Sequence, residues 1–259
     1  MLAVSRRAVW RLFAAMPAVA MFVLAGTPAV AQRGGLVVSV ASSVADAVEE
    51  IAGVYRAQTG AAVSVNTGGS NSLARQIVEG APVALFLSAD EAQMNAVEKA
   101  GRLVAGTRSV LLTNELAIVS PTSSAVTVGH VLEGRVKRLA MGDPMAVPAG
   151  VYGRTWLEHQ GAWSRVSASV VPFPTVRAVV AAVASGRADA GIVYATDAIG
   201  ANVRVVSRVA AKEHDYLRIE YPIALIKGAS EGEAGRFLEF MKGPQARTIF
   251  SRRGFGTPP

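Results

Sequence analysis

The chain has 259 residues, a formal net charge of +7 and no cysteine, and 51% of its residues are hydrophobic. The lack of cysteine excludes disulfide bonds, thiolate metal sites, a cysteine nucleophile and a lipid-anchored cysteine. The sequence contains no basic run with interleaved aromatic residues, so it gives no reason to expect nucleic-acid binding.

The first 31 residues have the pattern of an export signal. Arginines at positions 6, 7 and 11 precede an apolar run over residues 12–26, and residues 29–31 form an A-x-A cleavage site. Pro17 interrupts the run, whereas a transmembrane anchor needs about 20 unbroken apolar residues. We expect export to the periplasm, cleavage after Ala31 and a mature chain of net charge +4, without insertion into the membrane. Ser5-Arg6-Arg7 is an incomplete twin-arginine pattern, so the export route stays open.

Short apolar strands alternate with amphipathic helices along the rest of the chain, a pattern typical of α/β proteins. In the first half, helical patterns that begin near residues 44, 70 and 90 follow strands expected at residues 36–40, 62–66 and 84–87. After a strand at residues 116–119 the alternation restarts. Helical patterns near residues 149 and 176 then follow strands at residues 139–141 and around 170–171, and a last strand of this half lies at 190–194.

The end of the chain does not continue the second half. A strand at residues 221–226 is followed by two helical patterns that we expect to pack on the first half. The sequence therefore predicts two doubly wound α/β lobes, joined by two crossing strands, with a ligand cleft between the lobes. In this prediction residues 1–31 are the signal peptide, residues 32–116 and 220–259 form the first lobe, and residues 117–219 form the second.

Four strand-to-helix junctions contain Ser, Thr, Gly or Pro. The N–H groups at the start of a helix have no partner within the helix, and the helix dipole favours negative charge there. Ligands of open α/β sheets bind at the carboxyl ends of strands, so two facing lobes would bring all four helix starts into one cleft. The junctions are at residues 40–44, 67–72, 147–150 and 172–176.

In the first-lobe junctions, Ser43 and Ser70 can donate hydrogen bonds through their hydroxyl and amide groups. A serine at a helix start is more often a plain N-cap, which accepts a hydrogen bond from the helix. Gly68 and Gly69 favour a ligand-binding role for Ser70, because glycine allows a ligand to approach the backbone closely.

In the second-lobe junctions, Pro148-Ala149-Gly150 offers only backbone donors, and proline in the first turn is also ordinary helix chemistry. Thr175 before Val176 fits an N-cap, and Tyr194 ends a strand where its phenol faces either the core or the cleft. No lysine or arginine lies within the junctions, and we expect Arg177 to face solvent. An anion bound here would be held by neutral dipoles.

No constellation in the sequence indicates catalysis. His130, His159 and His214 share no metal-ligand spacing, and the sequence lacks nucleophile-elbow, zinc-protease and phosphate-loop motifs. Asp143 and Asp189 fit turn or cap positions. Ser43 as a nucleophile would need an activating base that no motif supplies. A secreted enzyme acting on a phosphorylated or sulfated small molecule is therefore the weaker alternative.

Residues in order along almost the whole mature chain resemble the type II periplasmic binding proteins, and among them the molybdate-binding proteins of ABC transporters. The resemblance rests on short stretches that include the four junctions and their neighbours. These are residues 41–43, 72–77, 80–82, 86–90, 142–144, 147–152, 191–194, 197–198, 221–222 and 242–246.

The resemblance implies a monomeric binding protein rather than an enzyme. It would capture molybdate or tungstate, deliver it to an inner-membrane ABC-transporter permease and need no cofactor, the metal being present only within the oxyanion. By position it implies that the ligand is held by Ser43, Ser70, Ala149, Val176 and Tyr194. Ser72 is the alternative to Ser70, and residues 172–175 depart from the family's pattern. Sulfate or another tetrahedral oxyanion is the alternative ligand.

Overall fold

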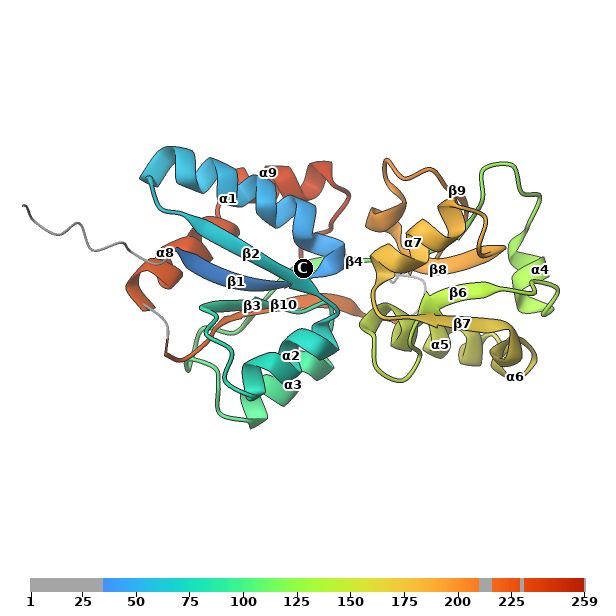
Figure 1. Cartoon of the computed structure of the whole chain (residues 1–259), viewed down its shortest axis with the longest axis horizontal. Helices are drawn as coiled ribbons and strands as arrows, with labels where there is room; N and C mark the ends of the chain where they lie inside the picture. The colour runs from blue at the N-terminus through green and yellow to red at the C-terminus, as the bar shows by residue number, and fades with distance from the viewer. Residues whose placement is uncertain (1–34, 210–215, 229–230, 259) are drawn as a thin grey trace, which may run out of the picture. The chain divides into compact units, whose positions relative to one another are not determined.

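The structure is a computed structural model that describes residues 35–209, 216–228 and 231–258 (Figure 1). These residues form two mixed β-sheets, each flanked by helices. The predicted export signal and His214 lie outside the described residues. Within the described ranges, no helix combines the length and the apolar character that crossing a membrane requires.

The first sheet has the strand order β2-β1-β3-β10-β4. β1 pairs in parallel with β2 and β3, whereas β10 is antiparallel to both β3 and β4. We call this sheet with its helices the first lobe. Its strands are β1 (Leu36–Ala41), β2 (Val63–Gly68), β3 (Leu85–Leu87), β4 (Ser109–Asn114) and β10 (Ile219–Leu225).

The second sheet repeats this arrangement with the strand order β7-β6-β8-β5-β9. β6 pairs in parallel with β7 and β8, and β5 is antiparallel to β8 and β9. We call this sheet with its helices the second lobe. Its strands are β5 (Leu116–Ser120), β6 (Leu139–Gly142), β7 (Val170–Phe173), β8 (Ala190–Tyr194) and β9 (Arg204–Val209).

Helices follow most of the parallel strands, as the alternating sequence pattern predicts. In the first lobe they are η1 (Ser42–Val44), α1 (Ala45–Thr59), α2 (Ser70–Val78), α3 (Glu91–Lys99), α8 (Glu231–Lys242) and α9 (Pro244–Arg252). In the second lobe they are α4 (Val128–Leu132), α5 (Pro148–His159), α6 (Trp163–Val166), η2 (Ser167–Ser169), α7 (Val176–Ala184) and η3 (Ala195–Ala198).

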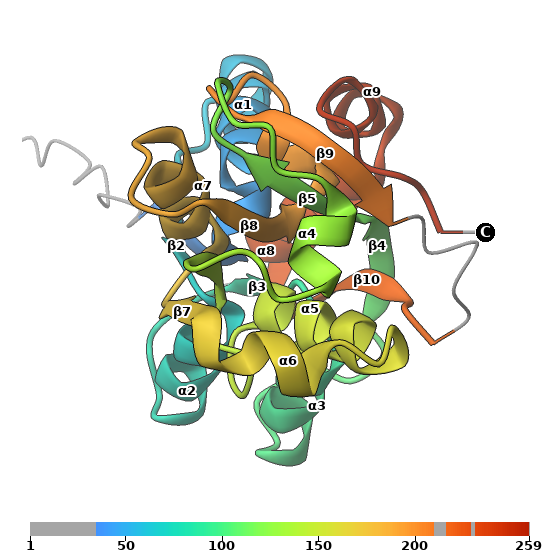
Figure 2. The ribbon, with the colours of Figure 1, turned by 90° about the vertical axis from the view of Figure 1, so that its right-hand side faces the viewer.

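The helices cover both faces of each sheet. In Figure 1, α1 and α9 lie on one face of the first sheet and α2 and α3 on the other. Figure 2 shows α5 and α6 on one side of the second sheet and α7 on the other. Sheets covered on both faces explain why the central strands β3, β5 and β8 are buried along their whole length. All five residues of β5 and all five of β8 are buried.

The predicted fold class is confirmed, with two α/β lobes built around two sheets. The chain crosses from the first sheet to the second at Glu115, between β4 and β5, and returns to the first sheet in β10. Two strands are absent from the prediction, namely β4 and β9. The parallel strands of both lobes end in the junctions that the sequence singles out, and these junctions position the site.

Candidate functional site

One small cavity is lined by residues from all four predicted junctions. Its volume is about 10 Å³, measured as space for the centre of a water-sized sphere, which is room for one small species rather than an organic metabolite. No lysine, arginine, aspartate or glutamate is among its lining residues in the described part of the chain. These are Ala41, Ser42, Ser43, Gly68, Gly69, Ser70, Ala89, Val147, Pro148, Ala149, Thr175, Val176 and Tyr194.

All five residues predicted to hold the ligand line this cavity. Ser43 lies in η1 after β1, and Ser70 is the first residue of α2 after β2. Ala149 and Val176 lie in the first turns of α5 and α7. Tyr194 is the last residue of β8. The structure thus brings together residues up to 151 positions apart in sequence, and Ser72 is not among the lining residues.

Ser70 is 1% exposed, and its hydroxyl is not used to cap its own helix. Instead, the backbone N–H of Ala89 donates to Ser70 Oγ at 3.0 Å. A serine hydroxyl has one hydrogen and two lone pairs, so this contact uses a lone pair and leaves the hydrogen for the cavity. The geometry therefore differs from the plain N-cap that a serine at a helix start most often forms.

Ala149 reaches the cavity because α5 begins very close to the end of β6. A Cβ atom on Gly150 would collide with the carbonyl oxygens of Gly142 and Asp143, so only glycine permits this approach. Pro148 is the first residue of α5 and has no N–H, which makes Ala149 the first residue of the helix with an amide to offer. The Val-Pro-Ala-Gly sequence thus brings one backbone donor to the cavity.

Val176 is the first residue of α7, and Thr175 caps this helix by accepting a hydrogen bond from the Ala178 amide at 3.2 Å. The Thr175 side chain therefore satisfies an amide deeper in the helix, while the Val176 amide lies ahead of the first helical hydrogen bond. The predicted cap at Thr175 is present. Because Val176 is only 3% exposed, an anion in the cavity would meet its N–H without competition from bulk water.

Two contacts hold the lobes together around the cavity. The Tyr194 hydroxyl of the second lobe donates to the carbonyl of Ala89 in the first, with a long separation of 3.4 Å. A Cβ atom built on Gly69 would lie 2.8 Å from the carbonyl oxygen of Pro174, so the two backbones approach as closely as glycine allows. The cavity is consequently closed only while the lobes stay in contact.

The sequence led us to expect that Arg177 faces solvent, but in the structure its side chain also contacts the first lobe. Its side chain is 44% exposed, but its Nε donates to the Ser42 carbonyl at 2.7 Å and its Nη2 pairs with Asp46 at 2.5 Å. Both partners belong to the first lobe. The arginine is therefore a contact between the lobes that lies beside the cavity, and it does not line the cavity itself.

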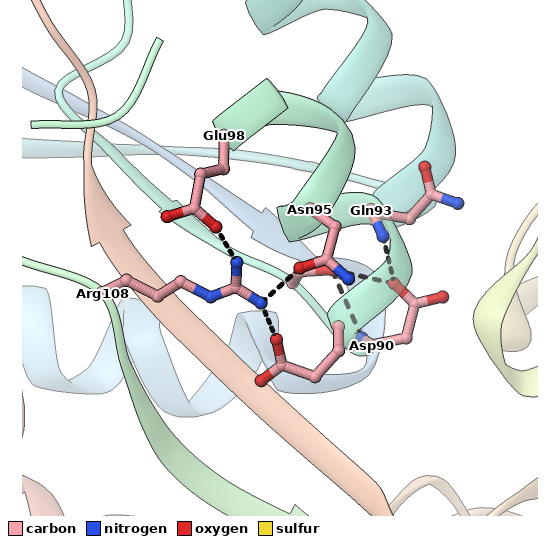
Figure 3. Close-up of polar contacts among 7 residues, drawn as sticks. Asp90, Gln93, Asn95, Glu98 and Arg108 are labelled. Atoms are coloured by element: carbon pink, nitrogen blue, oxygen red, sulfur yellow. Dashed lines mark hydrogen bonds and ion pairs between the residues drawn. The ribbon is translucent and has the colours of Figure 1, made fainter. Parts of the chain in front are cut away.

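Figure 3 shows the polar contacts at the start of α3, where Asp90 directly follows Ala89. Asp90 caps α3 by accepting from the Gln93 amide at 2.9 Å, and the Ser88 hydroxyl donates to the same carboxylate at 3.3 Å. Burial raises the pKa of Asp90 to about 6, against the lowering effect of these hydrogen bonds. Arg108, the residue before β4, contacts Glu91, Asn95 and Glu98 of α3.

Ala89 is the lining residue outside the four junctions that the sequence analysis did not single out, since its contribution is purely backbone. The signal that could have found it is a fifth strand-to-helix junction, in which Asp90 follows β3 as an N-cap. That junction has the same strand-to-helix order as the other four, and like the one at Thr175 it has a side-chain cap. The Ala89 amide donates a hydrogen bond to the Ser70 hydroxyl, and the Ala89 carbonyl accepts one from the Tyr194 hydroxyl.

Asp197 lies in η3, three residues after Tyr194, and its Oδ2 atom is buried without a hydrogen-bond partner in the described residues. Burial raises the pKa of this carboxyl to about 8, and nearby Asp46 adds to the effect. A hydrogen bond with the Tyr194 backbone and the charge of Arg177 act in the opposite direction. The folded protein therefore keeps a proton on Asp197 at a pH where the unfolded chain has lost it.

This raised pKa predicts that stability falls as pH rises from about 4 to about 8, because the folded state binds the extra proton in that window. Asp197→Asn removes the titration. Between pH 5 and pH 8, the free energy of unfolding of the variant should rise relative to that of the wild type by at least about 1 kcal/mol. This is the free energy that corresponds to roughly one pKa unit. Urea unfolding at both pH values measures the difference, and parallel pH profiles for the two proteins would contradict it.

A larger pocket, about 810 Å³, lies beside the strands that join the lobes. Its lining includes the carboxylates of Glu115 and Glu220 as well as two arginines, and none of the helix starts. Carboxylates repel an anion, so this pocket lacks the donor-only chemistry of the small cavity. Nor do the described residues contain a cluster of His, Asp or Glu that could hold a metal cation.

The histidines in the described part of the chain have structural contacts away from the cavity. His130 forms a capping box with Thr127 at the start of α4, and His159 stacks on Tyr216 with ring centroids 3.5 Å apart. Asp189 pairs with Arg138, and Asp143 accepts from the Met145 amide within a turn. These side chains form no constellation suited to acid–base catalysis at the cavity.

Comparisons with known proteins agree on one family. The model of the family described as bacterial extracellular solute-binding protein matches residues 36–256. The molybdate-binding protein ModA of Escherichia coli is 36% identical over 243 residues, which are 90% of this chain and 93% of the relative. Among solved structures, the periplasmic molybdate-binding protein of Azotobacter vinelandii aligns with a TM-score of 0.78 and 30% identity, covering 86% of this chain and all of that one.

A fourth similarity concerns the fold alone. The sulfate-binding protein SubI from Mycobacterium tuberculosis aligns with a TM-score of 0.73 at 16% identity, covering 85% of this chain and 86% of that one. Proteins that share this fold are therefore named for binding different anions. The residues of the cavity, rather than the fold, have to carry any argument about which anion binds here.

Proposed function

The chain belongs to the family of bacterial extracellular solute-binding proteins, and from this premise we propose that its small cavity captures molybdate or tungstate. One observation carries the proposal. Four helix starts and a strand end surround a cavity whose polar lining groups are neutral and supply hydroxyl and amide hydrogens. Ser43 and Ser70 donate through hydroxyl groups and Ala149 and Val176 through backbone N–H, and Tyr194 donates once its single hydrogen turns from the Ala89 carbonyl to the anion.

Molybdate at neutral pH is a fully deprotonated tetrahedral dianion, so each of its oxygens only accepts hydrogen bonds. A wall of donors satisfies such a ligand without a charged partner. Hydrogen phosphate would bring its own O–H into a cavity that presents hydrogens to it, and an unmatched buried polar group is costly. The lining therefore favours bare dianions over protonated ones.

Sulfate is also a bare dianion, so hydrogen-bond chemistry does not separate it from molybdate. Size does, because molybdate and tungstate are larger tetrahedra of nearly equal dimensions. Donors fixed on both lobes set the spacing that an ion has to span. We accordingly propose comparable binding of molybdate and tungstate, with sulfate as the weaker ligand.

A few such contacts are enough for micromolar binding of the anion. A hydrogen bond to a charged group contributes about 1.5–3 kcal/mol, and a helix start adds about 0.3–1 kcal/mol. Several such donors exceed the roughly 8 kcal/mol of micromolar binding after the entropy of association is subtracted. Because the donors come from both lobes, the anion stabilises the arrangement in which the lobes touch.

The cellular role that fits this chemistry is delivery. We propose that the exported protein works in the periplasm as a monomer and hands the oxyanion to an inner-membrane ABC-transporter permease. Among relatives, a Bacillus subtilis protein with 32% identity over 85% of this chain is described as a putative ABC transporter substrate-binding lipoprotein. A cofactor has no part in such a cycle. An enzyme is the weaker candidate, because no histidine lines the cavity within the described ranges to activate Ser43.

Thermal unfolding of the dialysed protein with excess molybdate, tungstate, sulfate or phosphate tests this function. An anion at about 1,000 times its dissociation constant adds ~4 kcal/mol of stability, a shift of several degrees. We expect large shifts with molybdate and tungstate only. A larger shift with sulfate would contradict the proposed ligand, and no shift with any anion would contradict anion binding.

Ser70→Ala and Ser72→Ala form a matched pair for the same experiment. The Ser70 hydroxyl lines the cavity, whereas Ser72 is not among the lining residues. We expect Ser70→Ala to lose most of the molybdate-induced shift and Ser72→Ala to keep it. The reverse result would assign the ligand contact to Ser72.

A further inference from the structure

A chain of hydrogen bonds leads from the cavity to the two segments that join the lobes. Ser43 Oγ lies 3.0 Å from Tyr221 Oη, and Asn114 Nδ2 lies 3.1 Å from the same phenol oxygen. Tyr221 belongs to β10, by which the chain returns to the first lobe, and Asn114 is the last residue of β4, before the first crossing. Tyr221 and Asn114 are both buried, so water does not compete for these bonds.

The orientation of the Asn114 amide is set by its neighbours. The backbone N–H of Glu115 donates to Asn114 Oδ1 at 2.9 Å, which fixes the oxygen on that side. The nitrogen consequently faces Tyr221 Oη and, at 2.9 Å, the hydroxyl of Thr196 in the second lobe. An amide nitrogen carries two hydrogens and only donates. Tyr221 Oη therefore accepts from Asn114.

This orientation decides the direction of the next bond. The phenol has one hydrogen, and of its two hydrogen-bond partners in the described residues only Ser43 Oγ can accept, so we assign the phenol as the donor to Ser43 Oγ. Burial raises the pKa of Tyr221 well above its usual value, so the phenol keeps its hydrogen over any ordinary pH range. Ser43 then accepts from Tyr221, and its own single hydrogen stays available to the cavity.

We propose that Asn114 and Tyr221 are positioning residues that make Ser43 a hydrogen-bond donor toward the bound oxyanion. With the opposite polarity, Ser43 would donate to Tyr221 and present only lone pairs to a ligand that itself has only lone pairs. The inference deepens the proposed function and rests on it. It adds to the cavity two residues that never touch the ligand and that come from the segments joining the lobes.

We call the hydrogen bonds from Asn114 through Tyr221 to Ser43 the relay. It also reaches the second lobe, because Asn114 donates to Thr196, two residues after Tyr194. One amide thus contacts β10 in the first lobe and η3 in the second. The donor direction at Ser43 is set by a group that both lobes hold in place. The first-lobe serine is therefore oriented for the anion in the same arrangement that brings Tyr194 to the cavity.

A thermodynamic cycle tests the relay, with molybdate affinity measured by isothermal titration calorimetry on four proteins. Tyr221→Phe removes the phenol oxygen but keeps the ring, which packs against Tyr194 and Phe255 with centroids 5.8 and 5.6 Å away. We expect Tyr221→Phe to weaken binding about tenfold in the wild-type background. In the Ser43→Ala background we expect less than a twofold effect, because the group that Tyr221 orients is already absent.

Tyr55→Phe is the matched control, since Tyr55 is a buried tyrosine of α1 that packs against Phe237 and Phe240 and is not among the residues that line the cavity. Its affinity for molybdate should equal that of the wild type. Equal losses for Tyr221→Phe in both backgrounds would show a general structural role and overturn the relay, as would wild-type affinity of the single variant. Wild-type protein that fails to bind molybdate would overturn the proposed function, and the relay with it.

Discussion

Val176→Pro should weaken molybdate binding about 10- to 100-fold while leaving the fold intact. The substitution deletes a single backbone N–H, and a hydrogen bond to a charged group contributes about 1.5–3 kcal/mol. Val176 is the first residue of α7, where proline is favoured because the first amides of a helix have no intrahelical partner. Thr175 is extended, with φ −146° and ψ 154°, which is the conformation that a residue before proline prefers.

The chain offers a close control for this substitution at α4. Val128 is also the first residue of its helix, and it also follows an extended threonine that caps the third amide of the helix. Val128 is not among the residues that line the cavity. Val128→Pro should keep wild-type affinity in the same calorimetric titration. Equal effects of the two prolines, or no effect of Val176→Pro, would exclude the Val176 amide as a ligand contact.

Gly69→Ala should weaken molybdate binding at least tenfold by preventing full contact between the lobes. The new Cβ would lie 2.8 Å from the Pro174 carbonyl oxygen in the second lobe, a distance that real Cβ atoms do not adopt. Its other close neighbour, Asn71 Oδ1, is the end of a side chain and can rotate away. Gly69 has φ −66° and ψ 135°, so alanine fits the local backbone and the penalty falls on the closed arrangement.

Gly53→Ala is the control, because a Cβ on this glycine within α1 meets nothing within 4 Å. It should leave molybdate affinity unchanged and raise stability slightly, as alanine does in a helix interior. Melting temperatures without ligand should show that Gly69→Ala folds normally, and titration calorimetry gives the affinities. Wild-type affinity in Gly69→Ala would mean that the lobes bind the anion without this close approach.

Local sequence patterns predicted the parts of the structure that depend on local chemistry. The strands of β-branched residues, the N-cap at Thr175 and the helix starts follow from neighbouring residues. The four junctions lie around one cavity because each follows a parallel strand, and the carboxyl ends of such strands share one edge of a sheet. This regularity explains why a sequence without charged ligands could still indicate an anion site.

The strands that were missed show where local patterns end. β4 and β5 are separated by Glu115 alone, and the short polar stretch Thr113-Asn114-Glu115 gives no sign that the chain passes between two sheets there. β9 is an edge strand whose arginines at 204 and 208 interrupt its apolar pattern. In both cases pairing with distant strands decides the structure, and no window of neighbouring residues contains that information.

The contacts between distant residues were also beyond sequence reasoning. Ser43 and Tyr221 are 178 positions apart, and Asn114 and Tyr221 are 107 apart. Arg177 reaches Ser42 across 135 positions. Each contact needs the lobes and the joining strands to be in place first, so no spacing or motif marks it. The support for Ser70 by the Ala89 amide is of the same kind.

Anomalous diffraction from crystals grown with molybdate would test the central claim most directly, because the molybdenum position can be located without prior assumptions. The account predicts one strong peak in the cavity, with oxygens within hydrogen-bond distance of Ser43 Oγ, Ser70 Oγ, Tyr194 Oη and the amides of Ala149 and Val176, and without contact to a lysine or arginine. A peak at another place, or an anion held by Arg177, would contradict the claim that neutral donors from both lobes bind the ligand.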